Sequence, residues 1–205
     1  MKFYLWGGRG IPTISEKKEA IKQIIQREGI KELLHIPFAG VGPRHRISSR
    51  CMPEEFRLFV EGLGVRYLDA SYKEDIKEFD GKHIYINGGH YREFLLAMCN
   101  NSLLLEKLQQ AEIIIGESSG AMILGERVLN DRKSWFEKGL WLVGNTIIIP
   151  HYNTGRRQEE ELQQLHKEEQ EKTGCNILWI DETSFVRYEN GEYGEAFWMG
   201  GVYHL

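Results

Sequence analysis

The sequence predicts an α/β fold in which helices cover both faces of a mostly parallel β-sheet. Short runs of β-branched and other apolar residues alternate with longer amphipathic segments along most of the chain, and each short run leads into a turn and then a helix. In such folds, ligands bind beyond the carboxyl ends of the strands. Residues that follow the predicted strands are therefore the first candidates for a functional site.

The first part of the chain carries this alternation. Ser15 is a suitable N-cap for the first helix, Gly29 ends it, and Pro53 suits the first turn of the next helix. Apolar residues at helical spacing predict helices over residues 15–29 and 53–64. Apolar runs that lead into turns predict strands over residues 2–8, 31–40, 65–70, 82–89 and 111–118.

The last part of the chain departs from this rhythm. The charged run at residues 156–172 predicts one exposed helix, with Leu162 and Leu165 on its inner side. Residues 176–181 and 184–203 look like late strands, and the "ENGE" stretch within them suits a hairpin turn. We therefore expect antiparallel strands near the C-terminus.

Composition and charge narrow the class of protein. The chain has 205 residues, of which 41% are hydrophobic and 27% charged, which favours one globular domain over residues 1–205. A net charge of −4 argues against binding to nucleic acid. No apolar run approaches the ~20 residues of a membrane-spanning helix, and the N-terminus does not read as a secretory signal. We expect a cytoplasmic monomer or homodimer that does not bind a membrane.

The segment "IIIGESSGAMIL" at residues 113–124 carries the pattern Gly-x-Ser-x-Gly, with Ser118 at its centre. It follows a β-branched strand and precedes a predicted helix, which is the setting of a nucleophile elbow. The glycines on either side suit a strained turn, because larger side chains would collide with neighbouring backbone. The amide of Ser119, at the start of the helix, is a candidate donor to a developing oxyanion. An ordinary glycine-rich helix cap is the alternative interpretation.

A serine nucleophile needs a base, and the sequence offers seven histidines. His151 follows a β-branched run and Pro150, which places it at the carboxyl end of a strand, the edge where Ser118 also lies. His90, beside "NGG", is the main rival. Three other histidines suit the base less well, because they lie in a strand body, at the opposite sheet edge or in the charged helix: His35, His83 and His166.

A carboxylate should orient the imidazole, and spacing does not choose among those available. Asp131 lies in the loop between Ser118 and His151, and the alternatives are Glu126, Asp181 and Glu182. Gly88 and Gly89 follow the strand before the elbow, where bare amides can approach a substrate carbonyl. The three cysteines are widely spaced and show no metal-ligand pattern, so no metal is expected.

Taken together, "IYINGGHYREFLL", "IIIGESSGAMILGE", "VLND" and "IIIPHYN" resemble the peptidase E family of serine peptidases, which comprises aspartyl dipeptidases and their cyanophycinase relatives. The resemblance implies a class I glutamine amidotransferase-like (flavodoxin-like) fold and a serine peptidase that needs no cofactor. It also implies that Ser118 is the nucleophile, His151 the base and Asp131 the third member of a triad. The implied oxyanion donors are the amides of Gly88 and Ser119.

Four departures from the family pattern bear on specificity. Ser119 stands where the family usually has Ala, Glu117 places a carboxylate beside the nucleophile, and His90-Tyr91 replace Asn-Thr. The segment after His151 is shorter than in aspartyl dipeptidases, so the substrate-binding arginine aligns with either Arg156 or Arg157. The expected substrates are short peptides, including dipeptides with an N-terminal Asp. An esterase-like serine hydrolase and a non-catalytic binding module of the same fold remain alternatives.

Overall fold

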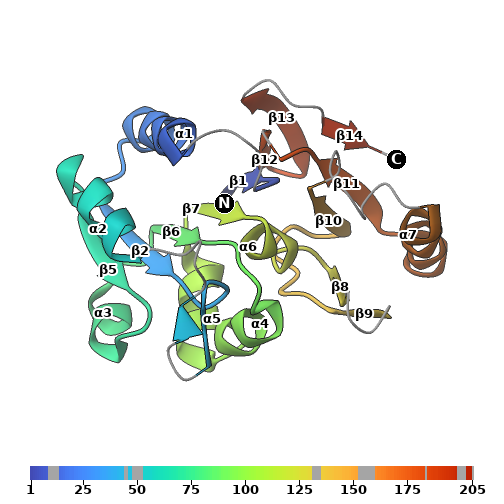
Figure 1. The fold of residues 1–205 in the computed structure, drawn as a ribbon, viewed down its shortest axis with the longest axis horizontal. Helices are drawn as coiled ribbons and strands as arrows, with labels where there is room; N and C mark the ends of the chain where they lie inside the picture. The colour runs from blue at the N-terminus through green and yellow to red at the C-terminus, as the bar shows by residue number, and fades with distance from the viewer. Residues whose placement is uncertain are drawn as a thin grey trace.

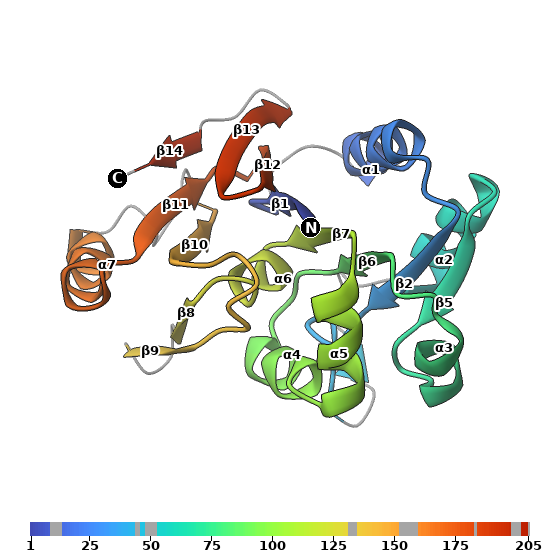
Figure 2. The same cartoon turned by 180° about the vertical axis from the view of Figure 1, so that it is seen from behind.

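The structure is a computed structural model that describes residues 1–8, 14–43, 46–47, 53–130, 135–151, 160–182, 184–197 and 202–204. Its strands form a seven-stranded sheet, a five-stranded sheet and a small pair, which Figures 1 and 2 show from opposite sides. The small pair joins β3 (Val41–Gly42) to β4 (Arg46–Ile47). Among the described helices, none has the length and apolar character needed to cross a membrane.

The seven-stranded sheet confirms the predicted mostly parallel architecture. Five neighbouring strands run parallel, and an antiparallel hairpin completes one edge. Positive φ angles at Asn190 (55°) and Gly191 (87°) suit the tight turn of that hairpin, as "ENGE" predicts. The strand order is β13-β12-β1-β7-β6-β2-β5, with β1 (Lys2–Trp6), β2 (Glu32–Ile36), β5 (Arg66–Asp69), β6 (His83–Ile86), β7 (Ile113–Glu117), β12 (Phe185–Glu189) and β13 (Glu192–Phe197).

Helices cover both faces of this sheet, because successive side chains of a strand point to opposite faces. Tyr4 and Trp6 of β1 share a hydrophobic cluster with α1 (Ile14–Glu28) and α2 (Pro53–Gly62). Phe3 and Leu5 belong to a second cluster with α4 (Arg92–Cys99) and α5 (Ser102–Gln110). In Figure 1, α1 lies above the strands β6 and β7, and α4 lies below them.

A second sheet, which the sequence did not predict, adjoins the first. Its order is β14-β11-β10-β8-β9, with β8 (Arg127–Asn130), β9 (Trp135–Lys138), β10 (Thr146–Pro150), β11 (Asn176–Ile180) and β14 (Val202–His204). One buried hydrophobic cluster includes Leu5 of β1, Ile148 of β10 and Leu178 of β11, so the two sheets share a core. The single domain expected over residues 1–205 stays a prediction.

The charged helix α7 (Glu160–Thr173) packs through polar residues that apolar periodicity does not reveal. His166 is fully buried, and its ring lies edge-on to Trp179 at 5.0 Å and to Phe136 at 5.4 Å between ring centroids. Glu169 is also buried and pairs with Arg127 at 2.6 Å. Part of the helix predicted as exposed therefore lies against the second sheet.

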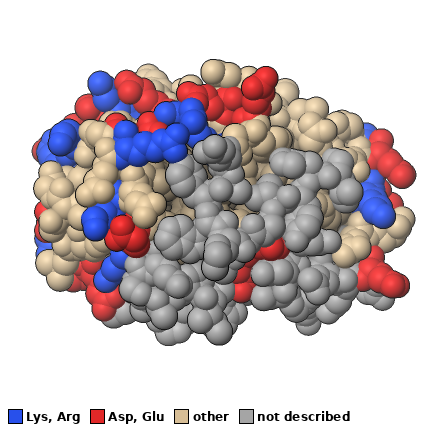
Figure 3. Space-filling model, turned by 90° about the horizontal axis from the view of Figure 1, so that it is seen from above, with Lys and Arg blue, Asp and Glu red and all other residues tan. Residues whose placement is uncertain are grey.

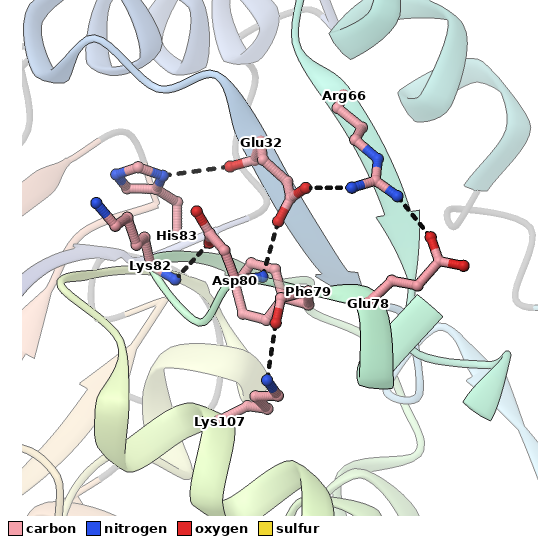
Figure 4. A network of polar contacts seen from close by, with 8 residues as sticks. All are labelled: Glu32, Arg66, Glu78, Phe79, Asp80, Lys82, His83 and Lys107. Carbon is pink, nitrogen blue, oxygen red and sulfur yellow. Dashed lines mark hydrogen bonds and ion pairs between the residues drawn. The ribbon is translucent and has the colours of Figure 1, made fainter. Parts of the chain in front are cut away.

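Polar contacts tie together the amino ends of β2, β5 and β6 (Figure 4). The Glu32 carboxylate accepts hydrogen bonds from Arg66 at 2.8 Å and from the Asp80 amide at 3.0 Å. Arg66 also donates to Glu78, at the end of α3 (Lys73–Glu78), at 2.6 Å. His83 lies at this edge, with Nδ1 3.3 Å from the Glu32 carbonyl oxygen. The carboxyl edge of the parallel strands is the opposite one, where we expect the functional site.

Charged side chains of both signs are mixed on the described surface. Figure 3 shows Lys and Arg beside Asp and Glu on one face of the molecule, in keeping with 26 basic and 30 acidic residues in the whole chain. The absence of nucleic-acid and membrane partners, the cytoplasmic location and the monomeric or homodimeric state stay predictions.

Candidate functional site

Ser118 occupies a strained turn at the carboxyl end of β7. Its φ of 50° and ψ of −115° are unusual for a residue with a side chain, and its amide donates to the Trp6 carbonyl oxygen at 2.9 Å. A Cβ atom on Gly120 would lie 2.3 Å from the Ile86 carbonyl oxygen, and one on Gly116 would lie 3.0 Å from Ala121 Cα. Both flanking glycines therefore have the steric role that the sequence suggested.

The helix after Ser118 is a single turn, α6 (Ser119–Met122), which is shorter than "AMILGE" led us to expect. Carbonyl oxygens that would continue the helix accept bonds from another segment instead: Leu140 donates to Ile123 at 2.7 Å and Val143 to Leu124 at 2.8 Å. Because a macrodipole grows with helix length, any effect of α6 on Ser118 comes mainly from individual amides.

His151 lies beside Ser118, with 2.7 Å between its Nε2 atom and Ser118 Oγ. It follows directly after β10, and its φ of 60° is also in the left-handed region. The rival His90 is exposed on its own loop. The structure therefore brings together the serine and the histidine that the sequence favoured, and both have strained backbones.

Glu182 makes the second contact of the imidazole, with its Oε1 atom 3.2 Å from His151 Nδ1. Pro150 of β10 lies opposite Ile180 of the parallel strand β11, so the residues that follow both strands emerge at the same edge. The Trp6 indole donates to the Glu182 carbonyl oxygen at 2.9 Å, which holds this segment in place. Glu182 was one of the carboxylates that sequence spacing left open. Asp131 lies outside the described residues.

Two glycines after β1, Gly7 and Gly8, pack closely against the residues of the candidate site, a role that sequence reasoning missed. A Cβ atom on Gly7 would lie 1.9 Å from the Asp181 carbonyl oxygen. Gly8 has a φ of 72°, and a Cβ atom there would lie 2.7 Å from Ser118 Cβ and 3.4 Å from His151 Cε1. The signal was present in "KFYLWGG", because a predicted strand that ends in two glycines points to a close approach.

The segment Gly88–Gly89 lies against the turn on another side. A Cβ atom on Gly88 would lie 2.7 Å from Ser118 Cβ, and one on Gly89 would lie 2.0 Å from the Ala39 carbonyl oxygen. The Ser119 hydroxyl donates to the Gly89 carbonyl oxygen at 2.7 Å and so ties the two segments together. Gly88 and Ser119, the predicted oxyanion donors, thus both adjoin Ser118, and Gly89 is linked to them through the Ser119 hydroxyl. Arg156 and Arg157 lie outside the described residues.

Glu117 is part of a compact polar cluster rather than a free charge in the site. Its Oε2 atom accepts hydrogen bonds from Lys17 Nζ at 2.5 Å and from the Tyr85 hydroxyl at 2.6 Å. Burial opposes its ionisation, but the charge and hydrogen bond of Lys17, with hydrogen bonds from Tyr85 and the Gly88 amide, hold its pKa below the usual value. Glu117 is therefore a carboxylate paired with Lys17.

The three side chains of Ser118, His151 and Glu182 are linked in series by the two contacts of the imidazole. They have the residue types and the connectivity of a nucleophile, a base and an orienting carboxylate. Within the described ranges, no group of three or more His, Cys, Asp or Glu side chains is arranged to hold a metal ion. The chemistry that this arrangement supports is nucleophilic attack by a serine hydroxyl.

Comparison with known proteins gives a family and several structural relatives, among them the following two. The model of Peptidase family S51 matches residues 5–195. A peptidase from an acI-B1 Actinobacterium superposes with a TM-score of 0.69 at 21% identity, covering 98% of this chain and 88% of that one. A protein from Listeria monocytogenes EGD-e, described as a "Putative Peptidase E Protein", superposes with a TM-score of 0.64 at 19% identity. The match covers 97% of this chain and 98% of that one. No curated protein sequence matches the chain.

Proposed function

Because the chain belongs to peptidase family S51 and is a serine-type peptidase, we propose that Ser118 is its nucleophile, His151 its base and Glu182 the carboxylate that orients the base. The observation that supports this assignment is the pair of contacts on one imidazole, 2.7 Å to Ser118 Oγ and 3.2 Å to Glu182 Oε1. We choose Glu182 over Asp131 as the third member because Glu182 makes the Nδ1 contact.

In the proposed mechanism, Nε2 of neutral His151 takes the Ser118 proton while Oγ attacks the scissile carbonyl carbon. The carbonyl electrons move onto oxygen, which gives a tetrahedral intermediate. When this collapses, the C–N bond breaks, the amine takes the proton from His151, and an acyl ester remains on Ser118. A water molecule, deprotonated by the same imidazole, then attacks the ester. The acid leaves, Ser118 regains its proton, and one water is consumed for each peptide bond.

Glu182 has a defined part in this scheme. A proton on Nδ1 directed at its carboxylate leaves the Nε2 lone pair facing the Ser118 hydroxyl, which is the tautomer that a general base needs. The carboxylate also stabilises the imidazolium that forms when His151 takes the proton. Trp6 supports this geometry, since it holds the Glu182 backbone and stacks on Phe185 at 5.0 Å between ring centroids.

The proposed oxyanion donors are backbone amides beside Ser118. The Ser119 amide belongs to the first residue of α6 and so has no acceptor within that helix. Gly88 supplies the second amide, and the bond from Ser119 Oγ to the Gly89 carbonyl oxygen keeps the two segments at a constant separation. Preorganised donors of this kind stabilise charge that develops in the transition state.

The proposed substrates are short peptides, including dipeptides with an N-terminal Asp. This proposal rests on the resemblance to aspartyl dipeptidases. Arg156 or Arg157 is the proposed partner of the substrate's Asp side chain, because guanidinium groups bind carboxylates in a bidentate manner. An esterase-like hydrolase would use the same catalytic residues on a different leaving group.

Release of free amino acid from paired dipeptides tests this function. We expect wild-type protein to cleave Asp-Ala and Asp-Leu faster than Asn-Ala and Asn-Leu, which have nearly the same shape without the charge. Ser118→Ala should abolish cleavage and also labelling by a fluorophosphonate probe. Equal activity in the variant would exclude Ser118 as the nucleophile. Hydrolysis of p-nitrophenyl esters without cleavage of any dipeptide would favour the esterase-like alternative.

A further inference from the structure

The Glu117 carboxylate lies unusually close to the place where negative charge would develop. Glu117 directly precedes Ser118, and a Cβ atom on Gly88 would lie 3.3 Å from Glu117 Cγ. The Gly88 amide hydrogen-bonds this carboxylate, which helps to keep its pKa low. The Gly88 amide, one of the proposed oxyanion donors, therefore lies beside the negatively charged Glu117 carboxylate.

An uncompensated carboxylate at this position would oppose catalysis. Its charge would repel the oxyanion, and the repulsion is stronger in a partly dry site than in water. The Glu117 side chain is only 15% exposed, so water screens it weakly. Glu117 needs a counter-charge to be compatible with the proposed chemistry.

Lys17 supplies that counter-charge from α1, a different part of the chain. Its Nζ atom lies 2.5 Å from Glu117 Oε2. It also lies 5.2 Å from the centroid of the Trp6 ring and 5.9 Å from that of Tyr85, and both rings attract a cation. The ammonium group is therefore held by three side chains, the Glu117 carboxylate and the two aromatic rings.

We propose that Lys17 is a positioning residue for catalysis, which acts through Glu117 by neutralising it and so keeps the oxyanion site favourable to negative charge. This inference rests on the proposed roles of Ser118 and Gly88. It goes beyond them, because it assigns a part in the reaction to a helix that none of the proposed catalytic residues belongs to.

Lys17 and Glu117 have different effects in this proposal, whereas loss of either partner of a purely structural ion pair would have the same effect. Without Lys17, the buried carboxylate keeps its charge beside the oxyanion. Without the charge of Glu117, a glutamine still accepts the hydrogen bonds, and the Lys17 side chain, 27% exposed, can turn its ammonium toward solvent. Loss of the cation should therefore slow the reaction, whereas loss of the anion should not.

A double-mutant cycle tests this asymmetry on the full chain with the best dipeptide substrate. We expect Lys17→Met to lower kcat by about tenfold or more with little change in KM, as for loss of charge stabilisation in the transition state. Glu117→Gln should have a kcat no lower than wild type. The double variant should recover to within about threefold of Glu117→Gln, because neighbouring charges couple strongly. Lys22→Met is the matched control, since Lys22 of the same helix pairs with Glu19 at the surface and should leave kcat unchanged.

Three outcomes would overturn the proposal: an unchanged kcat in Lys17→Met, equal losses of kcat in Lys17→Met and Glu117→Gln, or a double variant as slow as Lys17→Met. The melting temperature of each variant separates folding from catalysis. Fluorophosphonate labelling separates this proposal from the proposed function. Labelling of Ser118 in wild type with an unchanged kcat in Lys17→Met would contradict the role of Lys17 alone, whereas absence of labelling in folded wild type would contradict Ser118 as nucleophile.

Discussion

The Glu182 carboxylate lies 3.2 Å from Nδ1 of His151, the ring nitrogen that faces away from Ser118. This contact joins the carboxyl ends of two neighbouring parallel strands, β10 and β11, whereas Ser118 follows β7 in the other sheet. The candidate site therefore lies where the two sheets meet.

Replacement of Glu182 tests its proposed role. Glu182→Gln keeps the shape but removes the charge that orients and stabilises the imidazolium, so we expect kcat to fall by about 100-fold to about 10,000-fold with the fold intact. Asp131→Asn should have a much smaller effect. Steady-state kinetics on both variants decides between the two carboxylates. The reverse order of effects would return Asp131 to the role that the family resemblance implies.

Removal of the Ser119 hydroxyl should loosen the link between α6 and the Gly88–Gly89 segment. The hydrogen bond from the Ser119 hydroxyl to the Gly89 carbonyl oxygen is 2.7 Å long, and Ser119 is only 7% exposed. A net contribution of about 1 kcal/mol is typical of such a bond. We expect Ser119→Ala to lower kcat by roughly fivefold while KM stays constant. If kcat and melting temperature both match wild type, the hydroxyl has no part in holding the two segments.

A side chain at Gly8 should displace the catalytic pair. In Gly8→Ala the new Cβ atom would start 2.7 Å from Ser118 Cβ, so the turn must shift, and a misplacement of about 1 Å costs on the order of 100-fold in rate. Gly29→Ala is the matched control, because Gly29 has a similar φ of 66° but no atom within 4 Å of the added Cβ. Both variants should lose some stability from backbone strain, and only Gly8→Ala should lose activity. Equal activities would show that the contact is tolerated.

Buried His35 should make the protein less stable in acid. Burial, with the nearby charge of Lys17, lowers the pKa of His35 from 6.5 to about 3. The unfolded chain therefore binds a proton that the folded chain excludes, so stability is highest above pH 6.5 and falls as the pH drops toward 3. Between pH 8 and pH 5 the loss should be about 2 kcal/mol. Urea unfolding of wild type and His35→Phe at both pH values measures this loss of stability. Equal losses in the two proteins would show that His35 is not its source.

The local features of the site could be predicted from the sequence because adjacent residues encode them. A β-branched strand, a turn with glycines on both sides of Ser118 and a following apolar segment lie within residues 113–124. His151 could be favoured in the same way, since it directly follows the strand that ends at Pro150. These predictions needed only the direction of each strand and the edge at which it ends.

The partners of these residues were decided by tertiary structure, because they come from distant parts of the chain. Lys17 meets Glu117 across 100 residues, and Trp6 meets the Glu182 backbone across 176. Such contacts depend on strand order and register, and on the division of the late strands between two sheets, which no local pattern encodes. The sequence by itself determined a serine turn and a histidine at the carboxyl ends of strands. Only the packing of distant segments brought Glu182 to the imidazole and Lys17 to the Glu117 carboxylate.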